Sequence, residues 1–185
     1  MGKDLGGVLN VVLAGLGLKR RRRTGWLDYG LKKAESVADH SYGLALLAML
    51  VAELQGLDVE KAVKMALLHD LAEAYLGDLT PRQKRAIGKK ENTHKLEYSI
   101  LATLVKQLPS GLSVKYLELV HELYENKTPE ARLVHMLDKL EMALESLMLE
   151  LETGKNLRKF RREALNTEIG REFLSLVMDG KSKRS

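Results

Sequence analysis

The pair His69-Asp70 has the clearest capacity for chemistry in this sequence. It stands in residues 59–74, where apolar residues recur at the helical period. At about 100° per residue, Asp70 falls within the apolar stripe, with His69 and Glu73 on its flank. Burying a carboxylate without a partner costs several kcal/mol. The segment therefore predicts a compensating cation, either a buried Lys or Arg or a metal ion.

Two further candidate ligands, His40 and Asp138, stand in other predicted helices. His40 lies in the first turns of a helix predicted for residues 36–55, and Asp138 lies at the border of the apolar stripe of a long later helix. Adjacent residues in a helix diverge by roughly 100°, so His69 and Asp70 can hold an ion between them while other helices supply the remaining ligands. Two imidazoles and two carboxylates suit one divalent ion, such as Mn, Co, Fe, Ni, Zn or Mg, with positions left for water.

Composition restricts the class of protein. The 185 residues are 45% hydrophobic but only 5% aromatic, and Val and Ile do not gather in alternating runs, which favours an all-α fold over a sheet. The absence of Cys excludes a disulfide framework and a thiolate metal site. The formal net charge of +5 permits an anionic partner such as a phosphate-bearing small molecule. It is too small for a dedicated nucleic-acid-binding protein, so we do not expect nucleic acid as a partner.

The predicted helices form a single compact helical bundle over residues 1–185. No internal repeat and no long linker divides the chain. The elements expected, in chain order, are an N-terminal helix at 4–18, a basic connector, helices at 36–55 and 58–77, a short helical piece from 81, helices at 91–108, 112–126 and 129–153, weaker helices in 157–178, and a basic tail at 179–185. The core that carries the metal site would occupy about residues 23–152.

The first predicted helix raises the question of a membrane span or a signal peptide. Its apolar stretch, residues 5–18, is too short to cross a bilayer, and its basic run follows the stretch instead of preceding it. No small-residue cleavage pattern closes it. We therefore expect no membrane association and a cytoplasmic location.

Four ordered segments resemble the HD-domain phosphohydrolases, whose defining pattern is a His, then a His-Asp pair, then a distant Asp. The segments are ESVADHS at residues 35–41, LLHDLAE at 67–73, GDLTP at 77–81 and LDKLE at 137–141. Within this family they look like the branch that contains the 5′-deoxynucleotidases, and the likeness runs from about residue 23 to about residue 152. A His-Asp dipeptide alone would be a weak signal, whereas four segments in order are a strong one.

The resemblance implies a set of site residues and a reaction. The ligands of one divalent metal ion would be His40, His69, Asp70 and Asp138. Glu73 and Asp78 would act beside the ion in the hydrolysis of deoxynucleoside 5′-monophosphates to deoxynucleoside and phosphate. The resemblance also implies an all-helical protein that is commonly dimeric, so we expect a homodimer.

Physical reasoning is consistent with roles for the two acids. One helical turn separates Glu73 from His69, so Glu73 could take the proton of an attacking water without binding the ion itself. Asp78 follows in a Gly-Asp loop, where a carboxylate could orient the water or serve the leaving 5′-oxygen. The spacing does not decide which acid does which.

Phosphate binding requires a cation, and Arg23 is the best candidate because a guanidinium group binds phosphate through two hydrogen bonds. The family comparison places an Arg near a Trp at this point, so Arg23 and Trp26 are expected to contact the substrate. Residues 20–23 are all arginines, which leaves open which of them faces the pocket. Trp26 could stack on a base or fill the core.

Less specific interpretations exist for the same residues. His69 and Asp70 could form a buried hydrogen-bonded pair that joins helices, and Glu73 could be a surface acid paired with a Lys. Asp78 could be a turn residue or a helix cap. Glu141 lies on the same predicted helix face as Asp138, where a salt-bridging role is the simpler interpretation and a contact with a ligand is the alternative.

Two other functions are compatible with these residues. The same metal site could hydrolyse nucleoside triphosphates, cyclic nucleotides or alarmones, as related HD enzymes do. The chain could also be a non-catalytic helical module that binds RNA or a partner through its basic segments and keeps a metal ion for structure. Glu73 and Asp78 beside an open coordination position favour catalysis, because a structural ion does not need them.

Overall fold

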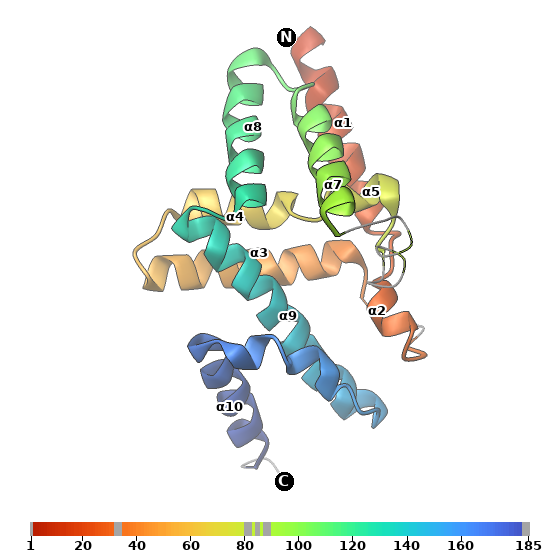
Figure 1. Cartoon of the computed structure of the whole chain (residues 1–185), viewed down its shortest axis with the longest axis vertical. Coiled ribbons are helices and arrows are strands. Elements are labelled where there is room, and N and C mark those ends of the chain that lie inside the picture. The colour runs from red at the N-terminus through yellow and green to blue at the C-terminus, as the bar shows by residue number, and fades with distance from the viewer. Residues whose placement is uncertain (1, 32–34, 80–82, 84–85, 87–89, 183–185) are drawn as a thin grey trace.

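The computed structural model describes residues 2–31, 35–79, 83, 86 and 90–182, which are predominantly helical (Figure 1). The α-helices are α1 Gly2–Leu18, α2 Thr24–Leu27, α3 Val37–Leu54, α4 Val59–Leu68, α5 Glu73–Leu76, α7 Lys90–Val105, α8 Ser110–Glu125, α9 Pro129–Thr153 and α10 Glu168–Ser182. Two short 3-10 helices, η1 Arg158–Arg161 and η2 Ala164–Asn166, precede α10. Over these residues the extended pairing consists of one isolated bridge, between Arg22 and Ser36. The all-α prediction is confirmed.

Helix α3 lies in the centre of the molecule, with α4 and α9 packed against it (Figure 1). It begins with a capping box, in which the Ser36 hydroxyl accepts from the Asp39 backbone N–H and the Asp39 carboxylate accepts from the Ser36 N–H. Leu44 of α3, Met65 of α4 and Leu140 of α9 are fully buried in the shared core. In the described part of the chain α3 is the one helix long and apolar enough to cross a membrane, and 39% of that apolar window is buried inside the molecule.

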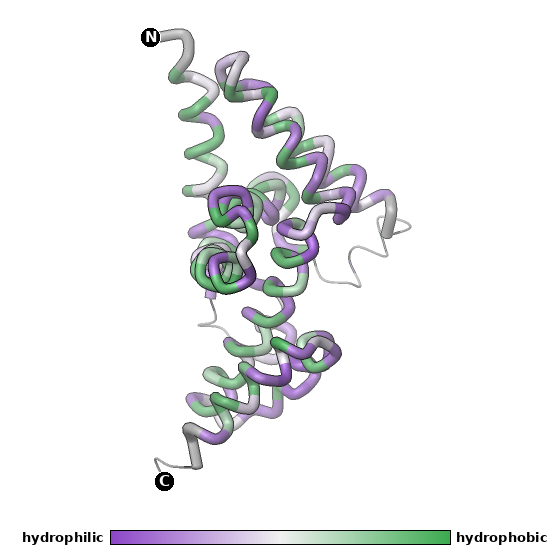
Figure 2. The backbone as a smooth tube through the Cα atoms, turned by 90° about the vertical axis from the view of Figure 1, so that its left-hand side faces the viewer, coloured by the Kyte–Doolittle hydropathy of each residue, from purple (hydrophilic) through white to green (hydrophobic). Residues whose placement is uncertain are grey.

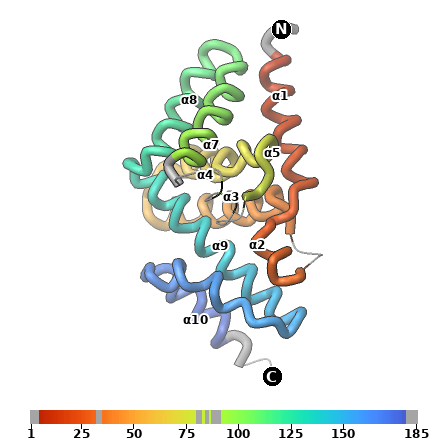
Figure 3. The backbone as a smooth tube through the Cα atoms, turned by 45° about the vertical axis from the view of Figure 1, so that its right-hand side comes forward, coloured from red at the N-terminus to blue at the C-terminus, as the bar shows by residue number. Residues whose placement is uncertain are grey.

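Helix α9 runs from this central layer toward the C-terminal helices (Figure 3). Its start follows from Thr128, whose side chain accepts from the Ala131 N–H, and from Pro129 at the first helical position. Its end follows from Gly154 in the left-handed conformation. The predicted bounds of 129–153 are therefore confirmed.

The two chain ends lie at opposite ends of the molecule (Figure 2). Helix α1 packs on α3, α5 and α7, and a Cβ added at Gly7 would lie only 1.7 Å from the backbone oxygen of Gln107, so glycine permits the close approach. The C-terminal helix α10 extends to Ser182 and includes the first residues of the predicted tail. The rest of that tail, residues 183–185, lies outside the described residues.

The structure corrects one predicted helix. Periodicity predicted a continuous helix from 58 to 77, but α4 ends at Leu68 and α5 begins at Glu73. Between them the backbone forms hydrogen bonds to the third residue back, from the Leu71 N–H to Leu68 and from the Glu73 N–H to Asp70. The His-Asp pair therefore lies in a turn at the end of a helix and not in its middle. The helical piece predicted from residue 81 begins outside the described residues.

Candidate metal centre

The turn after α4 points His69 and Asp70 in a common direction. The Nδ1 atom of His69 donates to the carbonyl oxygen of Ala66 at 2.7 Å, because a carbonyl can only accept. This leaves Nε2 of His69 as the ring atom that faces the site, and it lies 3.1 Å from Oδ2 of Asp70. The pair thus presents one nitrogen and one oxygen on the same side.

Two other helices bring further donors to this point. His40 of α3 is fully buried, and its Nε2 atom lies 3.3 Å from Nε2 of His69 and 3.9 Å from Oδ2 of Asp70. Asp138 of α9 contacts His40, and the distance from Oδ1 of Asp138 to Nε2 of His40 is 3.1 Å. The predicted ligands therefore converge from α3, from the turn after α4, and from α9.

The donor set fits one divalent ion. The donors of His40, His69 and Asp70 all lie within 4.8 Å of one another, whereas Asp138 lies outside this close group and contacts its His40 member. Two ligands bound to one ion at about 2.1 Å and at right angles lie about 3 Å apart, close to the separations seen here. Two imidazoles and two carboxylates suit a divalent transition metal or Mg²⁺.

Two side-chain cations also flank the carboxylates. Nη1 of Arg23 lies 2.9 Å from Oδ2 of Asp70, and Nζ of Lys139 lies 2.8 Å from Oδ2 of Asp138. Burial alone would raise the pKa of both carboxyls. His69 and Arg23 nevertheless hold the pKa of Asp70 well below its usual range. His40 and Lys139 lower the pKa of Asp138 in the same way. The lowered pKa favours the ionised form of both acids, which is the form in which a carboxylate can bind a metal ion.

The backbone before α2 decides which arginine faces the site. Arg22 pairs with Ser36 in the isolated bridge, and the Arg23 N–H donates to the Glu35 carbonyl. In extended backbone successive side chains point to opposite sides. Accordingly Arg23 is buried at 8% exposure, whereas Arg22 and the two arginines before it are exposed. Arg23 is the member of the run that contacts the candidate metal centre.

Negative charge surrounds the Arg23 guanidinium. Burial lowers the pKa of this group, but neighbouring carboxylates outweigh that effect and raise it above its ordinary value. In decreasing order of influence these carboxylates belong to Asp70, Asp78, Asp138 and Glu73. Glu73 itself is buried, at 6% exposure, and not on the surface. The structure thus places both predicted catalytic acids in the electrostatic surroundings of Arg23.

Asp78 holds the chain beside Arg23. Its Oδ2 atom accepts from the backbone N–H of Thr24, and the Thr24 hydroxyl lies 3.0 Å both from that atom and from the Asp78 carbonyl oxygen. These contacts join the loop after α5 to the first turn of α2. Asp78 therefore fixes the position of Arg23, an interaction that the sequence did not indicate.

Trp26 is a core residue in this structure. Its side chain has no exposed surface, its Nε1–H donates to Oε1 of Glu35 at 2.9 Å, and its ring packs on Phe160 with centroids 4.2 Å apart. This burial does not match the expected direct contact with substrate, because a base can stack only on an exposed ring face. The indole of Trp26 instead fills the core, which was the alternative interpretation of this residue.

Two acids that were not predicted as site residues, Glu35 and Glu141, lie near His40. Oε2 of Glu141 contacts Nδ1 of His40, and Glu35 lies close to both residues. Burial raises the pKa of Glu35 to about 7, and the charge of Glu141 adds to the effect. The signal for Glu141 was its position three residues after Asp138 on one helix face, whereas Glu35 is the first residue of the ESVADHS segment, in which only His40 was predicted as a site residue.

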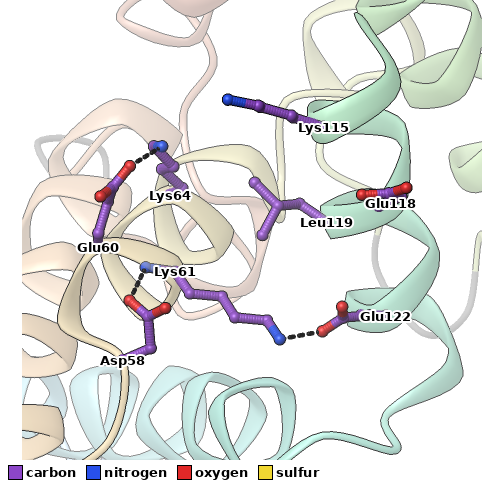
Figure 4. Close-up of a pocket in the computed structure, with 8 residues that line it drawn as sticks. All are labelled: Asp58, Glu60, Lys61, Lys64, Lys115, Glu118, Leu119 and Glu122. Atoms are coloured by element: carbon purple, nitrogen blue, oxygen red, sulfur yellow. Dashed lines mark hydrogen bonds and ion pairs between the residues drawn. The ribbon is translucent and has the colours of Figure 1, made fainter. Parts of the chain in front are cut away.

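A separate charged hollow lies between α4 and α8 (Figure 4). It encloses about 230 Å³, and no residue of the candidate metal centre lines it. Nζ of Lys61 lies 2.5 Å from Glu122 across the hollow, and Lys64 pairs with Glu60 on one wall (Figure 4). The Lys61–Glu122 ion pair joins α4 to α8.

Comparison with known proteins agrees with the geometry. Residues 17–175 match the family model described as an HD domain. The chain therefore belongs to the HD-domain family.

Its relatives include proteins named as nucleotidases. The chain is 38% identical over 150 residues to the 5′-deoxynucleotidase hdd1 of Schizosaccharomyces pombe, a match that covers 79% of this chain and 70% of that protein. It is 32% identical over 171 residues to the human 5′-deoxynucleotidase HDDC2, covering 91% of this chain and 81% of that protein.

Solved structures share the fold. A conserved hypothetical protein from Pyrococcus furiosus aligns with a TM-score of 0.71 and 33% identity, over 94% of this chain and 99% of that one. A protein described as a predicted metal-dependent phosphohydrolase, from Magnetospirillum magnetotacticum MS-1, aligns with a TM-score of 0.68 and covers 98% of this chain and 94% of that one. Its 22% identity supports the likeness of fold alone.

Proposed function

We propose that the chain is a metal-dependent 5′-deoxynucleotidase that hydrolyses deoxynucleoside 5′-monophosphates to deoxynucleoside and phosphate. The observation that carries the proposal is the convergence of His40, His69, Asp70 and Asp138. Membership of the HD-domain family and the names of the relatives support the choice of substrate.

We assign the four convergent side chains to one divalent ion, whose identity is open. When bound, such an ion neutralises charge on phosphate oxygens and acidifies water. Arg23 binds the phosphate group, because its guanidinium is held at the edge of the ligand cluster by Asp70 and Met142 and has more N–H donors than these two contacts use. Trp26 acts indirectly, since it anchors the helix that begins beside Arg23.

Glu73 is our choice for the group that takes the proton of the attacking water. It is buried, and its charge acts on Arg23, so it lies close to where the phosphate would bind. Asp78 fixes the Arg23-Thr24 segment and remains a second candidate for proton transfer to the leaving 5′-oxygen. Variants of the two acids would separate these roles.

We further propose a homodimer of single-domain chains in the cytoplasm. The exposed face of α1 supports self-association, because large apolar side chains recur on it at helical spacing and are exposed. Single exposed apolar residues are normal on a protein surface, but a continuous apolar face is typical of an interface. These residues are Leu5, Leu9, Val12, Leu13 and Leu16. The leucine-rich part of α9, another candidate surface, is mostly core, with Met148 and Leu151 exposed.

Released phosphate measured across deoxynucleoside and ribonucleoside 5′-monophosphates, with and without added Mn²⁺, Co²⁺ or Mg²⁺, tests the proposal. We expect turnover of the deoxynucleotides that requires the metal. Absence of metal-dependent turnover of every monophosphate would refute it. Release of pyrophosphate from a triphosphate, or opening of a cyclic nucleotide, would replace it with one of the alternative HD activities.

A further inference from the structure

The two ring nitrogens of His40 have different neighbours. Nε2 faces Asp138 and His69 in the candidate metal centre, whereas Nδ1 faces the carboxylate of Glu141. We infer that Glu141 is a positioning residue for metal binding: its carboxylate contacts Nδ1 of His40 and so directs Nε2 of the same ring into the candidate metal centre. The inference rests on the proposed function through its metal site, and not on the identity of the nucleotide.

Helix α9 supplies a residue on each side of the imidazole ring. Asp138 and Glu141 are three positions apart, so they share one face of the helix. Asp138 contacts Nε2 of His40, and Glu141 contacts Nδ1. The imidazole ring therefore lies between two acids of the same helix, α9. Glu141 is buried, at 9% exposure, so its contact with His40 is shielded from water.

A glycine in α3 makes room for this carboxylate. A Cβ added at Gly43 would lie 2.6 Å from Oε1 of Glu141, and 3.2 and 3.3 Å from its Cγ and Cδ atoms. Glycine is an unfavourable residue in a helix interior, and Gly43 stands within α3 three residues after His40. The space at Gly43 is thus occupied by the Glu141 side chain.

The two histidines of the site are oriented by different acceptors. Nδ1 of His69 donates to the backbone carbonyl of Ala66, whereas Nδ1 of His40 contacts the side-chain carboxylate of Glu141. A carboxylate in this position fixes the tautomer and the ring orientation and makes the opposite nitrogen a more basic ligand. Loss of such a partner typically lowers metal affinity by about 10- to 100-fold.

The test uses the full-length chain, purified without metal, in the variants Glu141→Ala, Glu141→Gln and Gly43→Ala. The control is Glu145→Gln, a half-buried acid one turn further along the same helix. Titration calorimetry gives the affinity for Co²⁺, and the visible absorption of the Co²⁺ complex reports the ligand geometry. Thermal unfolding of the metal-free proteins shows which variants fold.

We expect Glu141→Ala to lower the Co²⁺ affinity by about 10- to 100-fold and to change the Co²⁺ spectrum. Glu141→Gln should lose less, because an amide oxygen still accepts from Nδ1, and it should keep the native spectrum. Gly43→Ala should lower the affinity by displacing Glu141, although alanine by itself favours the helix. Glu145→Gln should bind as the unaltered protein does.

Unchanged affinity and spectrum in Glu141→Ala would overturn the inference. If that variant does not fold, equal binding by Gly43→Ala and by the unaltered protein would overturn it instead. These readouts need no substrate. A chain that binds Co²⁺ but hydrolyses no deoxynucleotide would therefore defeat the proposed function and leave the role of Glu141 standing.

Discussion

Replacement of Arg23 by Ala should destabilise the metal-free protein and affect the metal-loaded protein much less. The Arg23–Asp70 pair has side-chain exposures of 10% and 18%, so removal of the guanidinium leaves a mostly buried carboxylate without its nearest cation. Breaking a buried pair costs 3–5 kcal/mol in other proteins, and the residual exposure here places the expected loss near the lower end, at about 3 kcal/mol.

A bound divalent ion should restore much of this loss, because it supplies positive charge to the same carboxylate. At 1,000 times its dissociation constant a ligand adds about 4 kcal/mol to the free energy of unfolding. Without Arg23 as a competitor for Asp70, the variant should bind the ion at least as tightly as the unaltered chain. It should nevertheless have a raised KM, since one charge-assisted hydrogen-bonding group for phosphate contributes about 1.5–3 kcal/mol.

Urea unfolding with EDTA and with saturating Mn²⁺ measures both effects. The control is Arg20→Ala, an exposed arginine of the same run, which should change the free energy of unfolding by less than about 0.5 kcal/mol. Equal midpoints for Arg23→Ala and Arg20→Ala in EDTA would show that the buried ion pair carries no stability, and the electrostatic reasoning would be wrong.

Three further predictions concern other parts of the molecule. Glu73→Gln should lower kcat by about 100-fold or more while the calorimetric Mn²⁺ affinity changes little; a large loss of affinity would instead make Glu73 a ligand. Hydrogen bonds from the Ser36 backbone and hydroxyl lower the pKa of Asp39, so this cap should stabilise the fold above pH about 5 and lose its effect as the pH falls through that pKa. Asp39→Asn should therefore cost about 1 kcal/mol in urea unfolding at pH 7 and progressively less as the pH falls through the lowered pKa of Asp39, and a cost independent of pH would contradict the capping assignment. Leu13→Asp, in the exposed face of α1, should give a monomer by light scattering if the proposed homodimer uses this face; an unchanged mass would exclude it.

Local signals predicted the helices well where they were strong. The bounds of α9 followed from Thr128, Pro129 and Gly154, and those of α3 from the Ser36 capping box. These signals act over three or four residues, so they can be read without knowledge of the fold. The break after Leu68 had no such signal, because the apolar period continues through the turn.

The sequence by itself determined the helical class and the types and order of the candidate ligands. Residue chemistry and helical periodicity are properties of the chain alone. Tertiary structure decided which side chains meet: Arg23 with Asp70, Trp26 with Glu35 and Phe160, and Glu141 with His40, a pair separated by 101 positions. Such contacts depend on how helices distant in sequence pack together, and no local pattern specifies that packing.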